Sequence, residues 1–222
     1  MRRSVRSVLL CSILTSPGCA GFKQAYHERV CWDGSTPIEC PSHSITLSCN
    51  QPLSIEPPTS PIPEVRLQVR LGNEVARPRV GALFSQHGDK PIFLQGTSAW
   101  QVLRDDLERL LVAGGFPVVD DPAAADMVIE GDVTLLDVRS EPGGLFDLKA
   151  PTTARATITV ELSQPDGSDD WEQVFSGMAR TEVAYAFLSD SERLLGEAYC
   201  GALSSFAKTA SSPEFLSRLA AD

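Results

Sequence analysis

A strict alternation of apolar and polar side chains along residues 155–162 sets the narrowest limits on the fold, because a period of two is typical of a β-strand with one buried face. Two further segments, 127–135 and 171–183, keep the same period. The apolar positions that share one face are Met127, Ile129, Val133 and Leu135; Ala156, Ile158, Val160 and Leu162; and Trp171, Phe175, Ala179 and Val183. The Pro165-Asp166-Gly167 turn joins the second segment to the third, so we expect three long antiparallel strands.

Shorter strands and loops surround this set. Alternation at Val65–Leu71 predicts one strand, residues 92–94 a short one and residues 116–119 another. Residues 72–90 are rich in Gly, Pro and charge and predict a loop. The polar stretch at 139–153 predicts a loop between the first two long strands, which is either a contact surface or a mobile connection.

Three segments have the apolar period of helices. The first runs over Ala99–Ala113, with a capping box at Ser98 and Gln101 and a stop at Gly114-Gly115. The second runs over 191–208 with a capping box at Ser189 and Glu192, and a short helix follows Ser212-Pro213. The stripes expected to face the core are Trp100, Leu103, Leu107, Leu110 and Leu111; Leu195, Ala198, Ala202, Leu203 and Phe206; and Phe215, Leu216 and Leu219. Together the patterns predict an α+β domain, an antiparallel-rich sheet with two long helices packed on one face.

The N-terminus has the pattern of an export signal. A basic start at Arg2, Arg3 and Arg6 precedes a short apolar stretch, Val8–Leu14, which is too short to span a bilayer. Small residues then lead to Cys19, as in the bacterial lipoprotein signal, where acyl chains on the cysteine anchor the protein. Cleavage after Ala20, which would yield an unanchored exported protein, and a misplaced start codon are the alternatives. Ala20 after the cysteine favours the outer membrane, by resemblance to enterobacterial sorting.

Prolines and serines dominate the next stretch, so the sequence divides into a signal segment (1–18), a Pro/Ser/Cys-rich tether (19–63) and an α+β periplasmic domain (64–222). The tether is either a plain linker or partly folded by its cysteines. Under either cleavage the mature chain keeps Cys31, Cys40, Cys49 and Cys200, and these four cysteines could form up to two disulfides in an oxidising compartment. Cys200 could equally be a buried free thiol. A zinc site with His27 or His43 is a further alternative, although no C-x-x-C pair is present.

Charge and motif content restrict the function. The net charge is −10, and loss of the signal arginines makes it more negative, which disfavours nucleic-acid binding and ionic adsorption to anionic lipid. The three histidines, His27, His43 and His87, lie in the tether or a polar loop, and no nucleophile elbow or phosphate-binding loop occurs. The acidic pairs Asp105-Asp106 and Asp120-Asp121 are interpreted as solvated residues. We therefore expect no enzyme, no catalytic residue, no metal and no cofactor.

The order of elements resembles the YajG-type family of uncharacterised bacterial lipoproteins over about residues 64–220. Four segments carry the resemblance. They are the helix from Trp100 to Leu110, Gly114-Gly115-Phe116-Pro117-Val118, Ala124 together with Asp126-Met127-Val128-Ile129, and Ser212-Pro213-Glu214-Phe215-Leu216. The resemblance implies a membrane-anchored domain without catalytic residues. A weaker likeness is to auxiliary lipoproteins of ABC-type lipid transport systems.

Two functions follow as hypotheses. The first is a non-enzymatic interaction module of the cell envelope, attached to the membrane through acyl chains on Cys19 and binding an envelope protein. The alternative is a lipid- or small-ligand-binding accessory subunit of an envelope transport complex. A filled core with an exposed strand edge would favour the module, whereas a deep apolar groove between the first helix and the sheet would favour the carrier.

Overall fold

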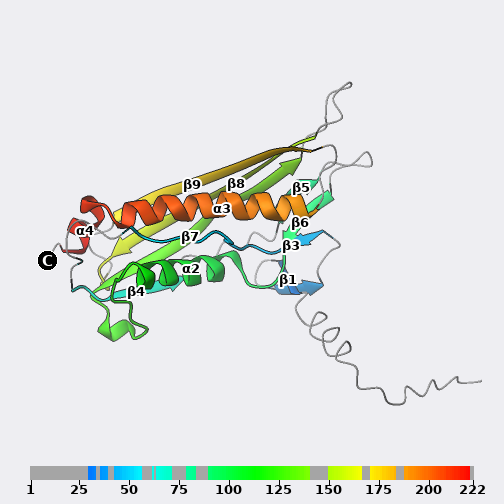
Figure 1. Cartoon of the computed structure of the whole chain (residues 1–222). Coiled ribbons are helices and arrows are strands. Elements are labelled where there is room, and N and C mark those ends of the chain that lie inside the picture. Colours follow the sequence, from blue (N-terminus) through cyan, green and yellow to red (C-terminus); the bar gives the residue numbers. More distant parts are fainter. Residues whose placement is uncertain are drawn as a thin grey trace, which may run out of the picture.

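The computed structural model describes residues 30–33, 36–39, 43–56, 62, 64–71, 79–83, 90–140, 150–166, 171–183 and 188–220 (Figure 1). Its strands are β1 (Val30–Asp33), β2 (Thr36–Glu39), β3 (Ser44–Ile45), β4 (Leu67–Leu71), β5 (Arg79–Leu83), β6 (Lys90–Leu94), β7 (Met127–Ser140), β8 (Ala150–Ser163) and β9 (Trp171–Val183). Its helices are α2 (Ala99–Ala113), α3 (Leu188–Ala210), α4 (Pro213–Leu219) and the short 3-10 helix η1 (Pro122–Ala124).

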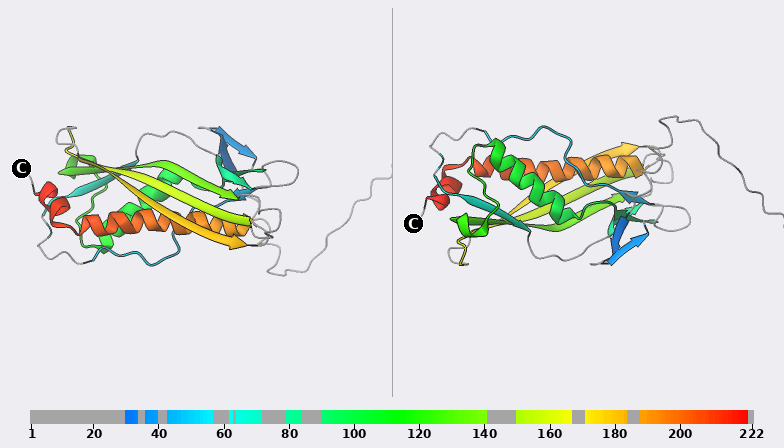
Figure 2. Two further views of the ribbon diagram at one scale, coloured as in Figure 1. Left: turned by 90° about the horizontal axis from the view of Figure 1, so that it is seen from above. Right: turned by 90° about the horizontal axis from the view of Figure 1, so that it is seen from below.

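Seven strands form the main sheet in the order β3-β6-β5-β7-β8-β9, and β4 pairs with β7 beside this path. The long pairs β7–β8 and β8–β9 are antiparallel, as expected. One edge of β7 is shared, because β4 pairs with residues 127–131 and β5 with residues 138–139, both in parallel. β1 and β2 form a separate antiparallel pair. Figure 2 shows the three long strands side by side, with β9 outermost. The fold is therefore α+β, with a mostly antiparallel sheet.

Both long helices lie on one face of the sheet, as the sequence predicts (Figure 1). All three predicted apolar stripes are buried. Glycines in the strands let the helices approach closely. A Cβ at Gly131 would lie 2.6 Å from Leu107 Cδ1, and a Cβ at Gly177 would lie 1.9 Å from the Ala198 carbonyl oxygen of α3. Leucine side chains of α2 therefore fill the space above β7 at Gly131, and the backbone of α3 lies directly against β9 at Gly177.

The long strands follow the predicted alternation except at one irregularity in β7. The register shifts between Val133 and Leu135, which leaves Thr134 as the extra residue of a β-bulge. Leu135 is 36% exposed, and Val138 lies in the core on the opposite phase. The prediction that Leu135 shares a face with Val133 is therefore wrong, because an extra residue reverses the facing of all later side chains.

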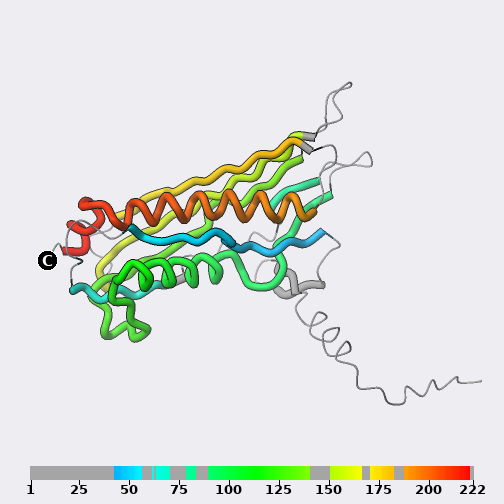
Figure 3. The backbone as a smooth tube through the Cα atoms, viewed as in Figure 1, coloured from blue at the N-terminus to red at the C-terminus, as the bar shows by residue number. Residues whose placement is uncertain are grey.

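Residues 43–56 differ most from the expectation. They belong to the domain, because β3 pairs with β6, and Ile45, Leu47 and Ile55 are buried in the core. Figure 3 shows this segment as the blue-to-cyan tube running between α2 and α3. We call residues 46–56 the strap. The predicted tether over 19–63 therefore does not extend through residues 43–56, whose widely spaced apolar side chains fill the gap between the helices.

Two smaller expectations also need correction. β5 forms inside the stretch 72–90 that was predicted to be a loop, and it pairs with both β6 and β7. The strand predicted at 116–119 is reduced to a single bridge between Val118 and Leu67. Both depend on pairing with distant residues, which local periodicity does not specify.

Candidate functional site

The strap is fixed to α3 by a disulfide between Cys49 and Cys200. Cys200 lies on the buried side of α3 and is 1% exposed. A few residues earlier, Glu192 Oε1 accepts hydrogen bonds from the Thr46 backbone N–H, at 3.0 Å, and from the Thr46 hydroxyl. Glu192 therefore holds the strap and does not complete a capping box with Ser189, since α3 already begins at Leu188. The sequence left the pairing of the four cysteines open. The Cys49–Cys200 bond joins a residue of the predicted tether to the core helix α3.

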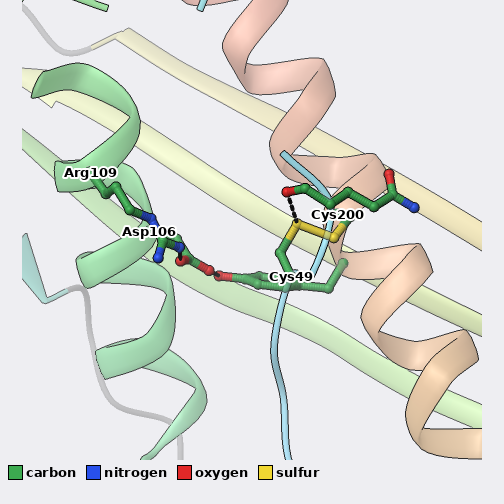
Figure 4. A network of polar contacts seen from close by, with 6 residues as sticks. Cys49, Asp106, Arg109 and Cys200 are labelled. Carbon is green, nitrogen blue, oxygen red and sulfur yellow. Dashed lines mark hydrogen bonds and ion pairs between the residues drawn. A yellow bond between two sulfur atoms is a disulfide. The ribbon is translucent and has the colours of Figure 1, made fainter. Parts of the chain in front are cut away.

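A buried polar group connects the two long helices next to the strap. The Tyr199 hydroxyl on α3 donates to Asp106 Oδ2 on α2 at 2.9 Å, and Arg109 Nη2 donates to Asp106 Oδ1. Figure 4 shows Asp106 between Arg109 and the region of the disulfide. Asp106 is only 6% exposed and Tyr199 is fully buried. We call Asp106, Arg109 and Tyr199 the inter-helix triad.

Burial dominates the titration of Asp106 and Tyr199. It raises the pKa of Asp106 above the ordinary value, although the Tyr199 hydrogen bond and the Arg109 charge oppose the increase. The pKa of Tyr199 is also well above its ordinary value, first because of burial and then because of the neighbouring Asp106 charge. Tyr199 therefore stays protonated and acts as a donor. The arrangement holds two helices together and contains no activated nucleophile.

A cavity of about 400 Å³ adjoins the triad, between α2, α3 and the strap. Its lining includes the apolar side chains of Leu53, Leu110 and Leu203 and the polar ones of Asn50, Gln51, Asp106 and Arg109. A second cavity, of about 450 Å³, lies on the other side of residues 50–51, between the strap and the first half of α3. The groove between the helices is thus largely occupied by the strap itself.

The opposite face of the sheet, which we call the outer face, has an ordered distribution of charge. One cross-strand row contains Glu130, Glu161 and Glu172 on β7, β8 and β9. Rows further along contain Thr159 beside Val174 and Thr157 beside Ser176, and the far end contains Arg155 beside Met178 and Thr153 beside Arg180. Val174 is 55% exposed and Met178 is 69% exposed. This face therefore has an acidic row at one end and a centre of apolar and hydroxyl-bearing side chains, and its arginines gather at the far end, where Asp137 and Glu182 accompany them.

β9 is the edge of this face, because within the described residues it pairs only with β8. It is 13 residues long and contains no proline. Its outer-face side chains are all exposed; they are Glu172, Val174, Ser176, Met178, Arg180 and Glu182. Natural proteins usually protect such an edge with proline, bulges or inward-pointing charges. The centre of β9 has none of these protections.

The other candidate residues are placed as follows. Cys19, Cys40, His27 and His87 lie outside the described residues, and only the backbone of Cys31 is described, in β1. Across the described ranges, His, Cys, Asp and Glu side chains form no group of three that could hold a metal ion. In the acidic pairs, Asp105 is exposed and accepts from Gln101, and Asp121 accepts from the Ala123 N–H at the start of η1.

Asp106 and Tyr199 were missed as a unit by the sequence analysis. Asp106 was interpreted as a solvated residue, and this is wrong, since it is buried. A signal existed, because Asp106 is three residues from Leu103 and four from Leu110, which places its charge inside the apolar stripe of α2. Tyr199 likewise lies four residues from both Leu195 and Leu203. When the apolar stripes of two helices each contain one polar residue, as Asp106 and Tyr199 are here, a buried polar pair between the helices is predicted.

No helix in the described part of the chain combines the length and apolar character needed to cross a bilayer. Neither a protein-family model nor a curated protein matches the sequence.

Solved structures resemble the fold at low identity. Protein XCC0632 from Xanthomonas campestris, described with the family DUF330, is 10% identical, covers 76% of this chain and 94% of its own length, and has a TM-score of 0.49. A Helicobacter pylori protein described as a neuraminyllactose-binding hemagglutinin homolog is 11% identical, with coverages of 79% and 96% and a TM-score of 0.46. A minor lipoprotein from Acinetobacter baumannii is 14% identical, with coverages of 68% and 90% and a TM-score of 0.40. At these values the likeness concerns the arrangement of strands and helices, and the function has to be argued from the residues of this chain.

Proposed function

We propose that this chain is a lipid-anchored protein of the bacterial cell envelope whose domain is a non-enzymatic interaction module. Acyl chains on Cys19 attach it to the membrane, in the outer membrane and facing the periplasm. The domain binds an envelope protein through the edge of β9 and the adjoining outer face. The observation that carries this proposal is the long edge strand with Val174 and Met178 exposed at its centre.

An unpaired strand edge is suited to binding because it presents a row of free N–H and C=O groups that another strand can pair with. Main-chain hydrogen bonds supply affinity in this mode, and alternate side chains supply specificity. On β9 those alternate positions are apolar in the middle and charged towards the ends, with Glu172 at one end and Arg180 near the other. This pattern fits a partner strand with apolar centre and charged flanks.

The packing between α2 and the sheet supports the same proposal over a carrier. Leu103 and Leu107 fill the space above Gly131, so the apolar interior beneath α2 is occupied by side chains. The Cys49–Cys200 disulfide supports the envelope location, because disulfides persist in oxidising compartments such as the periplasm. The basic N-terminus and the short apolar stretch before Cys19 are consistent with export.

Site-specific photo-cross-linking in envelopes of the native host tests this proposal. A cross-linking amino acid at Met178 probes the outer face, and one at Val112, which is 57% exposed on α2, is the matched control on the opposite side. We expect a discrete adduct with a polypeptide from Met178 and none from Val112. Equal adducts from both positions, or none from either, would contradict an interaction through this face.

The cavity beside the inter-helix triad favours a second candidate function, binding of a small amphiphile. Its volume of about 400 Å³ lies within the range of ligand sites, and its lining combines the apolar Leu53 and Leu110 with the charged Arg109. Native mass spectrometry with dodecanoate as the probe would test this. Ala113→Trp, which fills the lining, should abolish binding, and Val112→Trp, one residue away and outside the cavity, should not. An absence of dodecanoate adducts on the unmodified chain would exclude this function.

A further inference from the structure

The outer-face side chains of β9 complement themselves when the strand is read in reverse. From one end they are Glu172, Val174, Ser176, Met178 and Arg180, followed by Glu182, which forms an ion pair with Arg180. Reversal about Ser176 exchanges an acid with a base and one exposed apolar side chain with another. We infer that the partner of the β9 edge is a second copy of this chain, paired antiparallel about a twofold axis at Ser176. This inference rests on the proposed interaction through β9 and names the partner.

The pairing follows from the geometry of antiparallel strands. Directly opposed residues lie on the same face, about 5 Å apart, and cross-strand pairs of opposite charge or of apolar side chains are favourable. With Ser176 opposite its own copy, Val174 faces Met178 and Glu172 faces Arg180, and each pair occurs twice. A twofold interface is isologous, so one surface supplies both sides.

Neighbouring registers lose these pairs. A symmetric pairing centred on Gly177 would place Glu172 opposite Glu182 and Val174 opposite Arg180. Centring on Phe175 would place Glu172 opposite Met178. A twofold axis that falls between two consecutive residues would place outer-face residues opposite buried ones such as Phe175, which is 3% exposed. Only the register centred on Ser176 matches both charges and apolar side chains.

The side of β9 covered by α3 accommodates the same arrangement. In the paired molecule both copies of α3 would lie on one face of a continuous sheet. Gly201 of α3 lies close to β9, since a Cβ on it would be 3.3 Å from the Gly177 Cα. Ser205 follows on the same flank of the helix, four residues later.

Disulfide trapping tests the register directly, with the detergent-solubilised full-length chain. Ser176→Cys places the new thiol opposite its own copy, so mild oxidation should give a covalent dimer in high yield. Glu182→Cys is the matched control, because it is equally exposed on the same strand but would lie far from its own copy. A dimer from Ser176→Cys alone supports the inference. Equal yields from both, or no dimer from Ser176→Cys, overturn it.

A charge exchange provides an independent test by sedimentation equilibrium. Glu172→Arg and Arg180→Glu each oppose like charges twice in the dimer, so each alone should raise the dimer Kd about tenfold. The double variant restores opposite charges and should return the Kd to the wild-type value. A wild-type chain that stays monomeric, or a double variant as weak as the single ones, overturns the inference. An adduct of the Met178 probe with a different protein, without a Ser176→Cys dimer, would overturn this inference and leave the proposed function standing.

Discussion

Asp106 is a charged group placed where a helix normally presents only apolar side chains. Two donors compensate its burial, the Tyr199 hydroxyl at 2.9 Å and the Arg109 guanidinium. Even so, desolvation dominates and the pKa of Asp106 is raised. A buried carboxylate with partners on two elements specifies how those elements align more than it stabilises them. Its role is to fix α2 and α3 in register beside the strap.

This titration predicts a definite pH dependence. In the unfolded chain the carboxyl ionises near its usual pKa of about 3.9, and in the folded domain it ionises at a higher pH. Its contribution to stability is therefore fully present below the unfolded pKa and is lost as the pH rises through the folded one. Asp106→Asn removes that loss. The difference in unfolding free energy, variant minus wild type, should grow in favour of the variant from pH 4 upwards and then level off, as urea titrations at several pH values would measure.

Tyr199→Phe provides the comparison for this effect. It removes the donor that lowers the pKa of Asp106, so that pKa should rise further and the pH-dependent loss should extend to higher pH. Arg193→Gln, which breaks the ion pairs of Arg193 with Asp190 and Glu197 and leaves Asp106 untouched, should leave the pH profile unchanged. A flat difference between wild type and Asp106→Asn across the acidic range would contradict the assignment.

The Cys49–Cys200 bond makes the second prediction at the residue scale. It closes a loop with a sequence separation of 151 residues, so its loss releases considerable chain entropy in the unfolded state. The double variant Cys49→Ser/Cys200→Ser should lose about 3–5 kcal/mol of unfolding free energy in urea. Dithiothreitol should lower the unfolding free energy of the wild type by the same amount and leave that of the variant unchanged. If the double variant Cys31→Ser/Cys40→Ser loses more unfolding free energy than Cys49→Ser/Cys200→Ser, the assignment of the disulfide to Cys49 and Cys200 is wrong.

At the element scale, the helices and the long strands could be predicted because their information is local. The leucine stripe of α2, the cap at Ser98 and the Pro213 start of α4 lie within one or two turns of the residues that they organise. The strap could not be predicted, because its buried apolar residues, Leu47 and Ile55, are separated by polar and Pro residues and form no periodic pattern. Only the gap between two distant helices gives them a place.

The bulge in β7 and the contacts of Gly177 also depend on residues far away in the sequence, which lie on β8 and α3. Nothing in the local sequence marks Thr134 as the extra residue, since both phases of alternation continue with leucine, Leu135 and Leu136. The candidate site divides similarly. Cys49 and Cys200 could be named as a possible pair, but Asp106 with Tyr199 and the charge order of the outer face required knowledge of register.

Gly177 makes the prediction that belongs to this scale. A Cβ there would lie 1.9 Å from the Ala198 carbonyl oxygen and 2.7 Å from the Ala202 nitrogen, both backbone atoms of α3. Gly177→Ala should therefore push α3 away from β9 and cost at least about 2 kcal/mol of unfolding free energy. Gly201→Ala on the facing helix is the control. Its Cβ would be 3.3 Å from the Gly177 Cα, and the better helix propensity of alanine, about 1 kcal/mol, should offset that contact. Equal losses from the two variants in chemical unfolding would contradict this account.

At the scale of the whole molecule, the position of the strap changes the relation between the anchor and the domain. The sequence alone suggested a spacer of residues 19–63, but the folded domain already includes residues from His43 onwards. Because β1 and β2 fold back on each other, the reach is set by the chain from Cys19 to Val30, which spans roughly 40 Å at most. If Cys19 carries the proposed anchor, two copies of the chain are confined to a shared layer at the membrane, which raises their effective concentration at the β9 edge.

The anchor itself makes the last prediction, on the intact mass of the membrane-extracted native chain. If Cys19 is acylated, the mass should equal that of a chain beginning at Cys19 plus its acyl groups, because two or more chains are needed for stable attachment. Cys19→Ala should remove the added mass and release the chain from the membrane fraction. Its unfolding free energy should match that of the wild type, since residue 19 precedes the first described strand, β1. A mass that corresponds to a chain starting after Ala20, with nothing added, would contradict the anchor. Dimerisation through β9 would then have to occur without confinement at the membrane, and the charge-exchange variants would show whether the edge alone is sufficient.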